Sequence, residues 1–319
     1  MTPYNTCVLN NHTHSTSVDA ASRRNGFLLA AFGSIAFSGK AIIVKLAYRY
    51  GVDAVTLIMY RMLFALPMFL ILAWWSGRGK PPLTWRDAKA VLGLGFCGYY
   101  LASFLDFAGL RYISASLERL ILYLNPTLVL CLGILLFRRR VTRRQVAALA
   151  VSYVGVLSVF GRELSLQGSN VPLGATLVFG SAVSYAIYLA YSGEEVKRLG
   201  ALRLTGLATS VACLICIAQF LILRPISSMA VASEVLWLSA LNATACTFAP
   251  VLMVMMAIER LGASMTAQIG SLGPVSTILL AVLLLGEPFT VWVATGTVLV
   301  LVGIWLLTTQ PRASHAAAA

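Results

Sequence analysis

ASLERLILYLNPTLVLCLGILLFRRRVT (residues 115–142) and ASMTAQIGSLGPVSTILLAVLLLGEPFT (residues 263–290) are the two stretches that decide the fold. They lie 148 residues apart and share an opening Ala-Ser pair, a central proline and a closing threonine. Leucine matches would mean little in so apolar a chain, but the proline, at Pro126 and Pro274, is a rare residue within an apolar helix. The chain therefore contains an internal duplication.

Each copy holds five segments of membrane-spanning length. The composition is 59% hydrophobic and 11% charged, and a segment of about 20 apolar residues crosses a bilayer core of about 30 Å. Since five is odd, the second copy must enter the membrane from the opposite face, which is the architecture of secondary transporters. The predicted segments are 26–47, 54–75, 88–110, 115–137, 144–160, 173–193, 201–223, 235–257, 263–285 and 290–308.

We therefore predict an all-α integral membrane protein with ten transmembrane helices in two inverted five-helix repeats, 26–160 and 173–308. Residues 1–25 are polar and lack the basic-then-apolar order of a signal peptide, so we expect a disordered cytoplasmic tail. Residues 309–319 are expected to form a second cytoplasmic tail.

The net charge of +13 follows the positive-inside rule. With the N-terminus inside, 16 of the 24 lysines and arginines are cytoplasmic, and the external ones are only Arg49, Arg111, Arg162 and Arg224. The partner of these cations is the lipid bilayer and not nucleic acid. The sequence predicts a multi-pass protein of the cell (inner) membrane with both termini cytoplasmic.

Ionisable side chains inside a bilayer cost about 2.5–3.5 kcal/mol each, so each requires a reason. Those that lie away from the cytoplasmic ends of the predicted helices all belong to the first repeat and to the outer half of the membrane. They are Lys40, Lys45, Arg61, Asp106, Glu118 and Arg119. We expect Lys45 to extend towards the interface and Arg119 to be an interfacial anchor.

The other four suggest a binding site. In one interpretation Lys40 and Arg61 hold an anionic group of the substrate, and Glu118 or Asp106 completes the site or carries a proton. In the other, the four residues form two ion pairs that fix helix packing. Both remain open from the sequence.

Polar and aromatic stripes add further candidates. Tyr185 and Tyr188 lie on a stripe with Ser181 and Ser192, and Tyr188 is the repeat mate of Lys40, so this stripe is expected to face the substrate. The full set of predicted substrate-binding residues is Lys40, Arg61, Tyr99, Asp106, Glu118, Asn125, Tyr185, Tyr188 and Gln268.

Helix interruptions at equivalent points of two repeats mark the usual place of a transporter's site. Each proline removes a backbone donor and frees a carbonyl one turn earlier. The predicted hinge residues are Pro126, Gly270, Gly273 and Pro274; a simple packing kink is the alternative.

With these features established, the chain resembles the EamA repeat of the drug/metabolite transporter superfamily. The resemblance is carried by GLRYISAS (109–116), ERLGASMTAQIGSLGPVSTILLAVLLLGEPFT (259–290) and SIAFSGKAIIVKLAYRYGVDAVTLIMYRMLFA (34–65). It implies a basket in which helices one to four and six to nine surround a central cavity, with helices five and ten peripheral. It also implies alternating-access transport, in the direction of export. Arg138-Arg139 stands where the family's pattern has Gly-Glu in the first repeat. A role for that glutamate can therefore be carried over to Glu287 only.

Other classes of function find less support. Neither a His-Glu-x-x-His, nor a Gly-x-Ser-x-Gly, nor a phosphate-binding glycine loop occurs, so we expect no enzyme, no ATP-driven pump, no cofactor and no metal. A channel or membrane sensor stays open as an alternative, and an intramembrane enzyme is a third alternative with less support. Proton coupling and a homodimer also stay open. The cationic cluster favours amino acids or organic anions as the small-molecule substrate.

Overall fold

The computed structural model describes residues 9–137, 142–167, 170–261, 263–270 and 272–308, and these residues form helices joined by short connections. The first repeat contains α1 (Leu9–Tyr48), α2 (Ala54–Gly77), α3 (Trp85–Leu94), η1 (Gly95–Leu101), α4 (Ala102–Leu110), α5 (Ala115–Leu122), α6 (Asn125–Phe137) and α7 (Arg143–Gln167). The second contains α8 (Val171–Leu199), α9 (Ala201–Leu223), η2 (Ile226–Met229), α10 (Ser233–Ala243), η3 (Thr244–Phe248), α11 (Ala249–Leu261), α12 (Ala263–Gly270), α13 (Leu272–Leu280), η4 (Ala281–Leu285) and α14 (Val291–Thr308).

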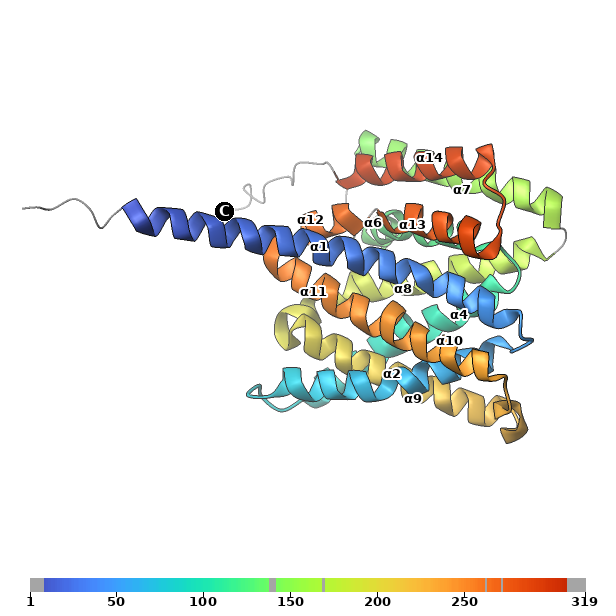
Figure 1. Ribbon diagram of the computed structural model, residues 1–319, viewed down its shortest axis with the longest axis horizontal. Helices are drawn as coiled ribbons and strands as arrows, with labels where there is room; N and C mark the ends of the chain where they lie inside the picture. Colours follow the sequence, from blue (N-terminus) through green and yellow to red (C-terminus); the bar gives the residue numbers. More distant parts are fainter. Residues whose placement is uncertain (1–8, 138–141, 168–169, 262, 271, 309–319) are drawn as a thin grey trace, which may run out of the picture.

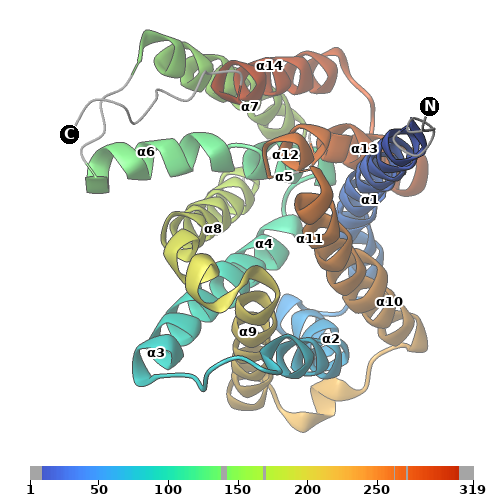
Figure 2. The same cartoon turned by 90° about the vertical axis from the view of Figure 1, so that its left-hand side faces the viewer.

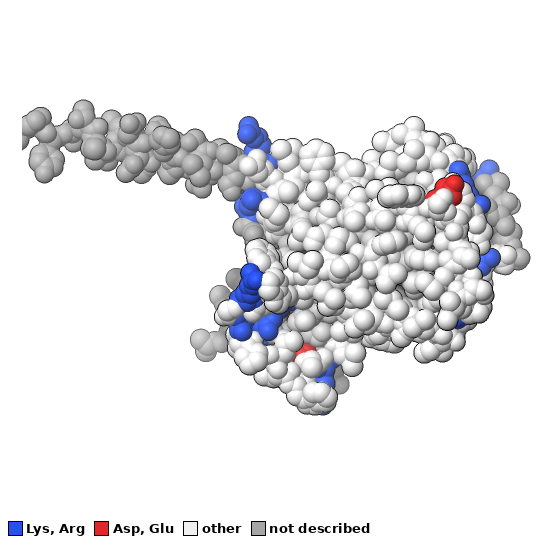
Figure 3. Space-filling model, turned by 60° about the horizontal axis from the view of Figure 1, so that its bottom comes forward, with Lys and Arg blue, Asp and Glu red and all other residues white. Residues whose placement is uncertain are grey.

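These elements make ten apolar crossings, as predicted. Eight are long and apolar enough to span a membrane, and the two shorter ones are Leu272–Leu285 and Val291–Leu306. The fifth crossing, α7, is longer than the sequence suggested, because its helix continues to Gln167. In Figure 3 lysine, arginine and acidic side chains gather at the two ends of the molecule, and an uncharged band separates them. Such a band is what contact with lipid requires.

The two repeats run through the bundle in opposite directions. In Figure 1 α1 runs from left to right, whereas its repeat mate α8 runs from right to left. The predicted inversion is therefore confirmed. The end at which α1 begins and α14 stops is called the terminal end below, and the other is called the opposite end.

The N-terminal segment differs from expectation. α1 begins at Leu9, so residues 9–25 are drawn as helix, where the sequence suggested a disordered tail. Residues 1–8 and 309–319 lie outside the described residues. The N-terminal extension of α1 has a physical reason. Once a packed segment has nucleated the helix, each further residue that becomes helical adds one hydrogen bond, so extension is easier than nucleation.

Helices α7 and α14 lie side by side at one edge of the bundle, outside the ring formed by the other crossings (Figure 2). Their backbones approach closely through small residues, the usual solution between helices in lipid. A Cβ atom added to Gly155 would lie 2.8 Å from the carbonyl oxygen of Gly296, and one added to Gly296 would lie 2.5 Å from Val159. This pair thus matches the peripheral position expected for helices five and ten.

Replacing Gly155 with alanine should force α7 and α14 apart. We expect a loss of about 1–3 kcal/mol, the usual cost of overpacking, seen as a lower thermal unfolding temperature in detergent. Gly161 on the same helix has open space where its Cβ would be, so Gly161→Ala is the matched control and should not lower stability. Equal effects of the two substitutions would contradict this packing.

The repeats are also joined at both ends of the bundle by polar contacts between residues at or near the ends of helices. At the opposite end, Asp53 caps α2 by accepting hydrogen bonds from the amides of Val55 (3.0 Å) and Thr56 (3.3 Å), and it pairs with Arg224 of the second repeat at 3.1 Å. At the terminal end, Arg198 pairs with Asp87 at 2.5 Å. Each contact joins one repeat to the other.

Asp53 should make stability depend on pH. Partial burial opposes its ionisation, but hydrogen bonds from Thr56 and the nearby Arg224 guanidinium hold the pKa of Asp53 below its ordinary value. A carboxylate whose folded-state pKa is lowered contributes stability above its unfolded pKa, and this contribution is lost as pH falls through the folded pKa.

Thermal unfolding of the wild type and of Asp53→Asn, measured from about pH 7 to about pH 3, tests this. The wild type should be the more stable protein at neutral pH, and the difference should shrink as the solution becomes acidic. Glu234→Gln, at the same end, is the control and should leave the pH profile unchanged. A difference that stays constant with pH would refute the role of Asp53.

Candidate functional site

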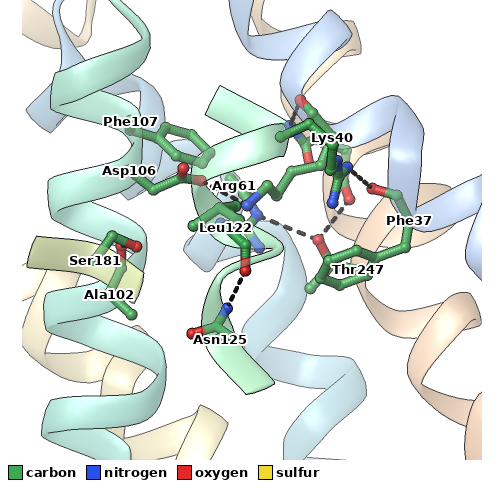
Figure 4. Close-up of polar contacts among 12 residues, drawn as sticks. Phe37, Lys40, Arg61, Ala102, Asp106, Phe107, Leu122, Asn125, Ser181 and Thr247 are labelled. Atoms are coloured by element: carbon green, nitrogen blue, oxygen red, sulfur yellow. Dashed lines mark hydrogen bonds and ion pairs between the residues drawn. The ribbon is translucent and has the colours of Figure 1, made fainter. Parts of the chain in front are cut away.

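The candidate site is built around an ion pair buried between α1 and α4. Lys40 Nζ lies 2.5 Å from Asp106 Oδ2, and the two residues are only 7% and 1% exposed. Figure 4 shows the two side chains pointing towards each other, with Arg61 beside them. An ion pair of this kind is costly to break, because removing one partner leaves an unpaired charge in the interior.

Arg61 enters the same region from α2. Its Nε donates a hydrogen bond of 3.2 Å to Thr247 Oγ1 in η3, and its guanidinium lies 5.1 Å from the centre of the Phe107 ring. Its Nη1 is buried and has no hydrogen-bond partner among the described residues. Arg61 therefore retains donor capacity inside the bundle.

Glu118 and Arg119 lie in the first turns of α5, where residues from Ala115 through Ile121 are all buried. Neither carboxylate oxygen of Glu118 receives a hydrogen bond from a described N–H or O–H group, although Asp106 and Arg119 are close to it. Arg119 is 4% exposed and its Nη2 donates to the carbonyl of Phe37 at 3.4 Å. The predicted interfacial anchor is therefore wrong, because this end of α5 packs inside the bundle.

A tyrosine cluster occupies the position that the repeat relates to Lys40 and Thr247. The hydroxyls of Tyr99 in η1 and Tyr188 in α8 are 3.1 Å apart, and Tyr185 stacks on Tyr188 with ring centres 5.5 Å apart. With the offset of 148 residues, Tyr188 is equivalent to Lys40 and Tyr99 is equivalent to Thr247. The first repeat thus supplies the cations, and both repeats contribute to the aromatic cluster.

The serine and tyrosine stripe of α8 is less open than expected. Ser181 Oγ donates to the carbonyl of Ala102 at 2.7 Å, and the ring of Tyr188 fits against Gly98, where any side chain would overlap it. This face of α8 packs on α4 and η1. Tyr185 keeps intermediate exposure.

Two wider helical turns lie at equivalent positions in the third and eighth crossings. After the offset of 148 residues, the π-helix η3 (Thr244–Phe248) falls within the π-helix η1 (Gly95–Leu101). Such turns occur frequently at functional sites. Thr247 was missed in the sequence, although the offset that pairs Lys40 with Tyr188 also assigns it to Tyr99.

The expected helix interruptions are present. Pro274 has no N–H, so the carbonyl of Gly270 lacks its helical donor, and the Tyr123 hydroxyl of the other repeat donates to it at 2.8 Å. In the first repeat Pro126 frees the carbonyl of Leu122 in the same way, and Asn125 Nδ2 donates to it at 2.7 Å.

A second hydrogen bond joins the repeats one turn further along. Ser38 Oγ of α1 donates to the carbonyl of Gly273 at 2.8 Å, and a Cβ atom on Gly273 would overlap the hydroxyl of Tyr123. The interrupted ninth crossing therefore contacts Ser38 of α1 and Tyr123 of the first repeat through the backbone carbonyls of Gly273 and Gly270.

The structure thus brings Lys40, Arg61, Asp106 and Glu118 together and holds the three tyrosines in a neighbouring cluster. Asn125 lies at the break between α5 and α6. Gln268 belongs to α12, but its side chain lies outside the described residues. Within the described part of the chain, no group of three or more His, Cys, Asp or Glu residues is arranged to hold a metal ion.

Tyr123→Phe should weaken the contact between the interrupted helices. It leaves the carbonyl of Gly270 without a donor, at a cost of about 1–3 kcal/mol. We expect faster amide hydrogen exchange in α12 and α13 and a lower unfolding temperature. Tyr191→Phe, on the exposed face of α8, is the control. If the amides of both variants exchange as slowly as those of the wild type, the Tyr123 hydrogen bond does not stabilise these helices.

Comparison with known proteins identifies relatives for both halves. Residues 24–161 and 172–309 each match the EamA-like transporter family. The chain is 29% identical over 280 residues to the uncharacterized transporter YcbK of Bacillus subtilis, across 82% of this chain and 86% of that protein. It is 26% identical over 167 residues, 52% of each protein, to a probable amino-acid metabolite efflux pump of Salmonella typhimurium. A protein of known crystal structure shares the fold, with a TM-score of 0.59 at 18% identity over 88% of this chain and 95% of that one.

Proposed function

Because the chain belongs to the EamA-like transporter family, a family of membrane transporters and not of enzymes, we propose that it exports amino acids or organic anions by alternating access. The protein is an integral multi-pass membrane transporter with a small-molecule substrate. The finer statement depends mainly on one observation, the cluster of charged side chains buried where α1, α2, α4 and α5 meet.

The charges of this cluster favour a substrate that carries a carboxylate. Lys40, Arg61 and Arg119 supply three cations, whereas Asp106 and Glu118 supply two acids. The excess of positive charge suits an anion, and the unpartnered Nη1 of Arg61 can donate to it. An amino acid would use both signs, with its carboxylate near Arg61 and its amine near the acids. The Salmonella relative named as a probable amino-acid metabolite efflux pump supports this substrate class.

The tyrosine cluster would hold the less polar part of the substrate. Tyr185 keeps intermediate exposure beside the buried Tyr188, and aromatic faces contribute apolar contact with a hydroxyl at the edge. The repeat relates the aromatic Tyr188 to the charged Lys40. A substrate between them would contact both repeats, as a carrier that works by rocking one repeat against the other requires.

The hinge residues support alternating access. The breaks before Pro126 and Pro274 occur at equivalent points, and each exposed carbonyl is held by one side-chain donor, Asn125 or Tyr123. A single hydrogen bond contributes about 1 kcal/mol net, so these contacts can exchange during a transport cycle. Gly270 and Gly273 add backbone freedom at the second break.

Two further elements of the proposal concern coupling and orientation. Asp106 and Glu118 lie close together, and two carboxylates that approach each other repel when both are ionised. This pair is therefore our candidate for carrying a coupled proton. The terminal end is assigned to the cytoplasm of the cell (inner) membrane because most of the lysines and arginines flank that side.

The function is tested with purified protein in liposomes. Saturable exchange of labelled amino acids or organic anions, without ion currents, is the expected result. Currents without saturation would identify a channel, and the absence of flux for every compound of both classes would refute the substrate assignment.

Substitutions of Lys40 and Asp106 test whether the ion pair binds substrate or only stabilises helix packing. Lys40→Gln alone should reduce folding yield, because Asp106 keeps a buried unpaired charge at a cost of about 3–5 kcal/mol. The double variant Lys40→Gln/Asp106→Asn removes both charges and should restore the yield. If these residues contact the substrate, the double variant should still transport at least about tenfold more slowly than the wild type.

The matched control is Arg198→Gln/Asp87→Asn, which removes an inter-repeat ion pair outside the cluster and should keep normal transport. Wild-type transport by the Lys40 and Asp106 double variant would show that the buried pair serves packing alone.

A further inference from the structure

A cationic cavity lies at the opposite end of the bundle, away from the buried cluster. It has a volume of about 390 Å³ and lies between the ends of α1, α4, α7, η4 and α14. Its charged lining residues are Lys45, Arg49, Arg111, Arg162, Glu163 and Glu287. We propose that this cavity is a binding site for a small anion bearing a carboxylate or a phosphate group.

The two acids of the cavity are already engaged. Glu287 accepts hydrogen bonds from the amides of Ala115 (2.7 Å) and Ser116 (3.2 Å) and from the Ser116 hydroxyl (2.7 Å). Glu163 accepts hydrogen bonds from the amide and hydroxyl of Ser114. Both carboxylates thus cap the first turn of α5, where negative charge is favoured by the exposed amides of the helix.

The cations of the cavity are largely unengaged. Arg49 donates one hydrogen bond of 3.1 Å to the carbonyl of Leu285. Of the residues that the structure describes, none forms a hydrogen bond or an ion pair with the side chain of Lys45, Arg111 or Arg162, although Glu287 and Glu163 lie near enough to Lys45 to attract its charge. Four cations against two capped acids leave the cavity with an excess of positive charge.

The distribution of cations over this end makes the cavity unusual. The positive-inside rule depletes the external face of lysine and arginine, and the sequence places four arginines there. Three of them, Arg49, Arg111 and Arg162, line this one cavity. The fourth, Arg224, is paired with Asp53. Arginine recognises carboxylate and phosphate with two parallel N–H donors, so these groups are the chemistry that the cavity fits.

Lys45 relates the cavity to the buried cluster along the axis of α1. It stands five residues after Lys40 on α1, a rise of about 7.5 Å along the helix. An anion held by Arg111 and Arg162 would therefore lie beyond Lys40, towards the opposite end of the bundle. Binding at this place is measurable without transport and does not depend on what the buried cluster carries.

Trp292 lines the cavity and provides a local probe. Purified protein in uncharged detergent is titrated with succinate and, separately, with inorganic phosphate at constant ionic strength, and tryptophan fluorescence is recorded. A saturable change that disappears in Trp292→Phe is the expected result. Arg111→Gln and Arg162→Gln should each weaken binding by about tenfold or more, since each removes charge-assisted hydrogen bonds.

Arg224→Gln is the matched control, because it removes an arginine from the same end but outside the cavity. Arg111 and Arg162 are exposed, and unfolding temperatures of all variants verify that they fold. Similar weakening by Arg224→Gln would overturn the proposal, since it would indicate a general effect of surface charge.

A second arm identifies the source of the anion. Phosphatidylglycerol is titrated into the same detergent solution, and the Trp292 signal is followed. A response to succinate or phosphate assigns the cavity to a soluble anion, and a response to phosphatidylglycerol alone, lost in Arg162→Gln, assigns it to a lipid headgroup. No response to any of the three compounds would overturn the proposal.

Discussion

Backbone carbonyls and amides inside a bilayer need partners within the protein, and this constraint explains where the irregular helices of this transporter lie. At the ninth crossing the proline leaves the carbonyl of Gly270 free, and Tyr123 satisfies it. In η1 the carbonyl of Cys97 accepts a hydrogen bond of 2.8 Å from Ser184. At these two places the interruption is tolerated because a side chain from another crossing donates to the carbonyl.

Several of these donors come from the opposite repeat, which ties the two halves together at their weakest points. Ser38 of the first repeat bonds the carbonyl of Gly273 in the second, whereas Ser181 of the second bonds that of Ala102 in the first. The hydrogen bonds run both ways across the repeat interface. Interrupted helices can exchange the side-chain donors to their free carbonyls at a modest cost in free energy, which suits a protein that changes conformation. A continuous helix would resist such a change.

The two halves share a backbone plan but divide the chemistry. With the offset of 148 residues, Lys40 is equivalent to Tyr188 and Arg61 is equivalent to Thr209. The ionic side chains at these positions therefore occur in one repeat and neutral side chains in the other. A strictly symmetric site would carry its charges twice and double the cost of burying them. Concentrating the charges beside α5 allows Lys40 and Asp106 to neutralise each other.

The sequence by itself determined the ten crossings, the duplication, the inversion and the set of ionisable residues within the membrane, because each follows from apolar length, offset or the parity of five. Only the tertiary structure decided which of these residues meet. Helical periodicity assigns a residue to a face but not to a partner, so the pairing of Lys40 with Asp106 and the capping of α5 by Glu287 could not be predicted. Arg119 was misplaced for the same reason: its depth depends on how α5 packs among its neighbours, which distance along the chain does not reveal.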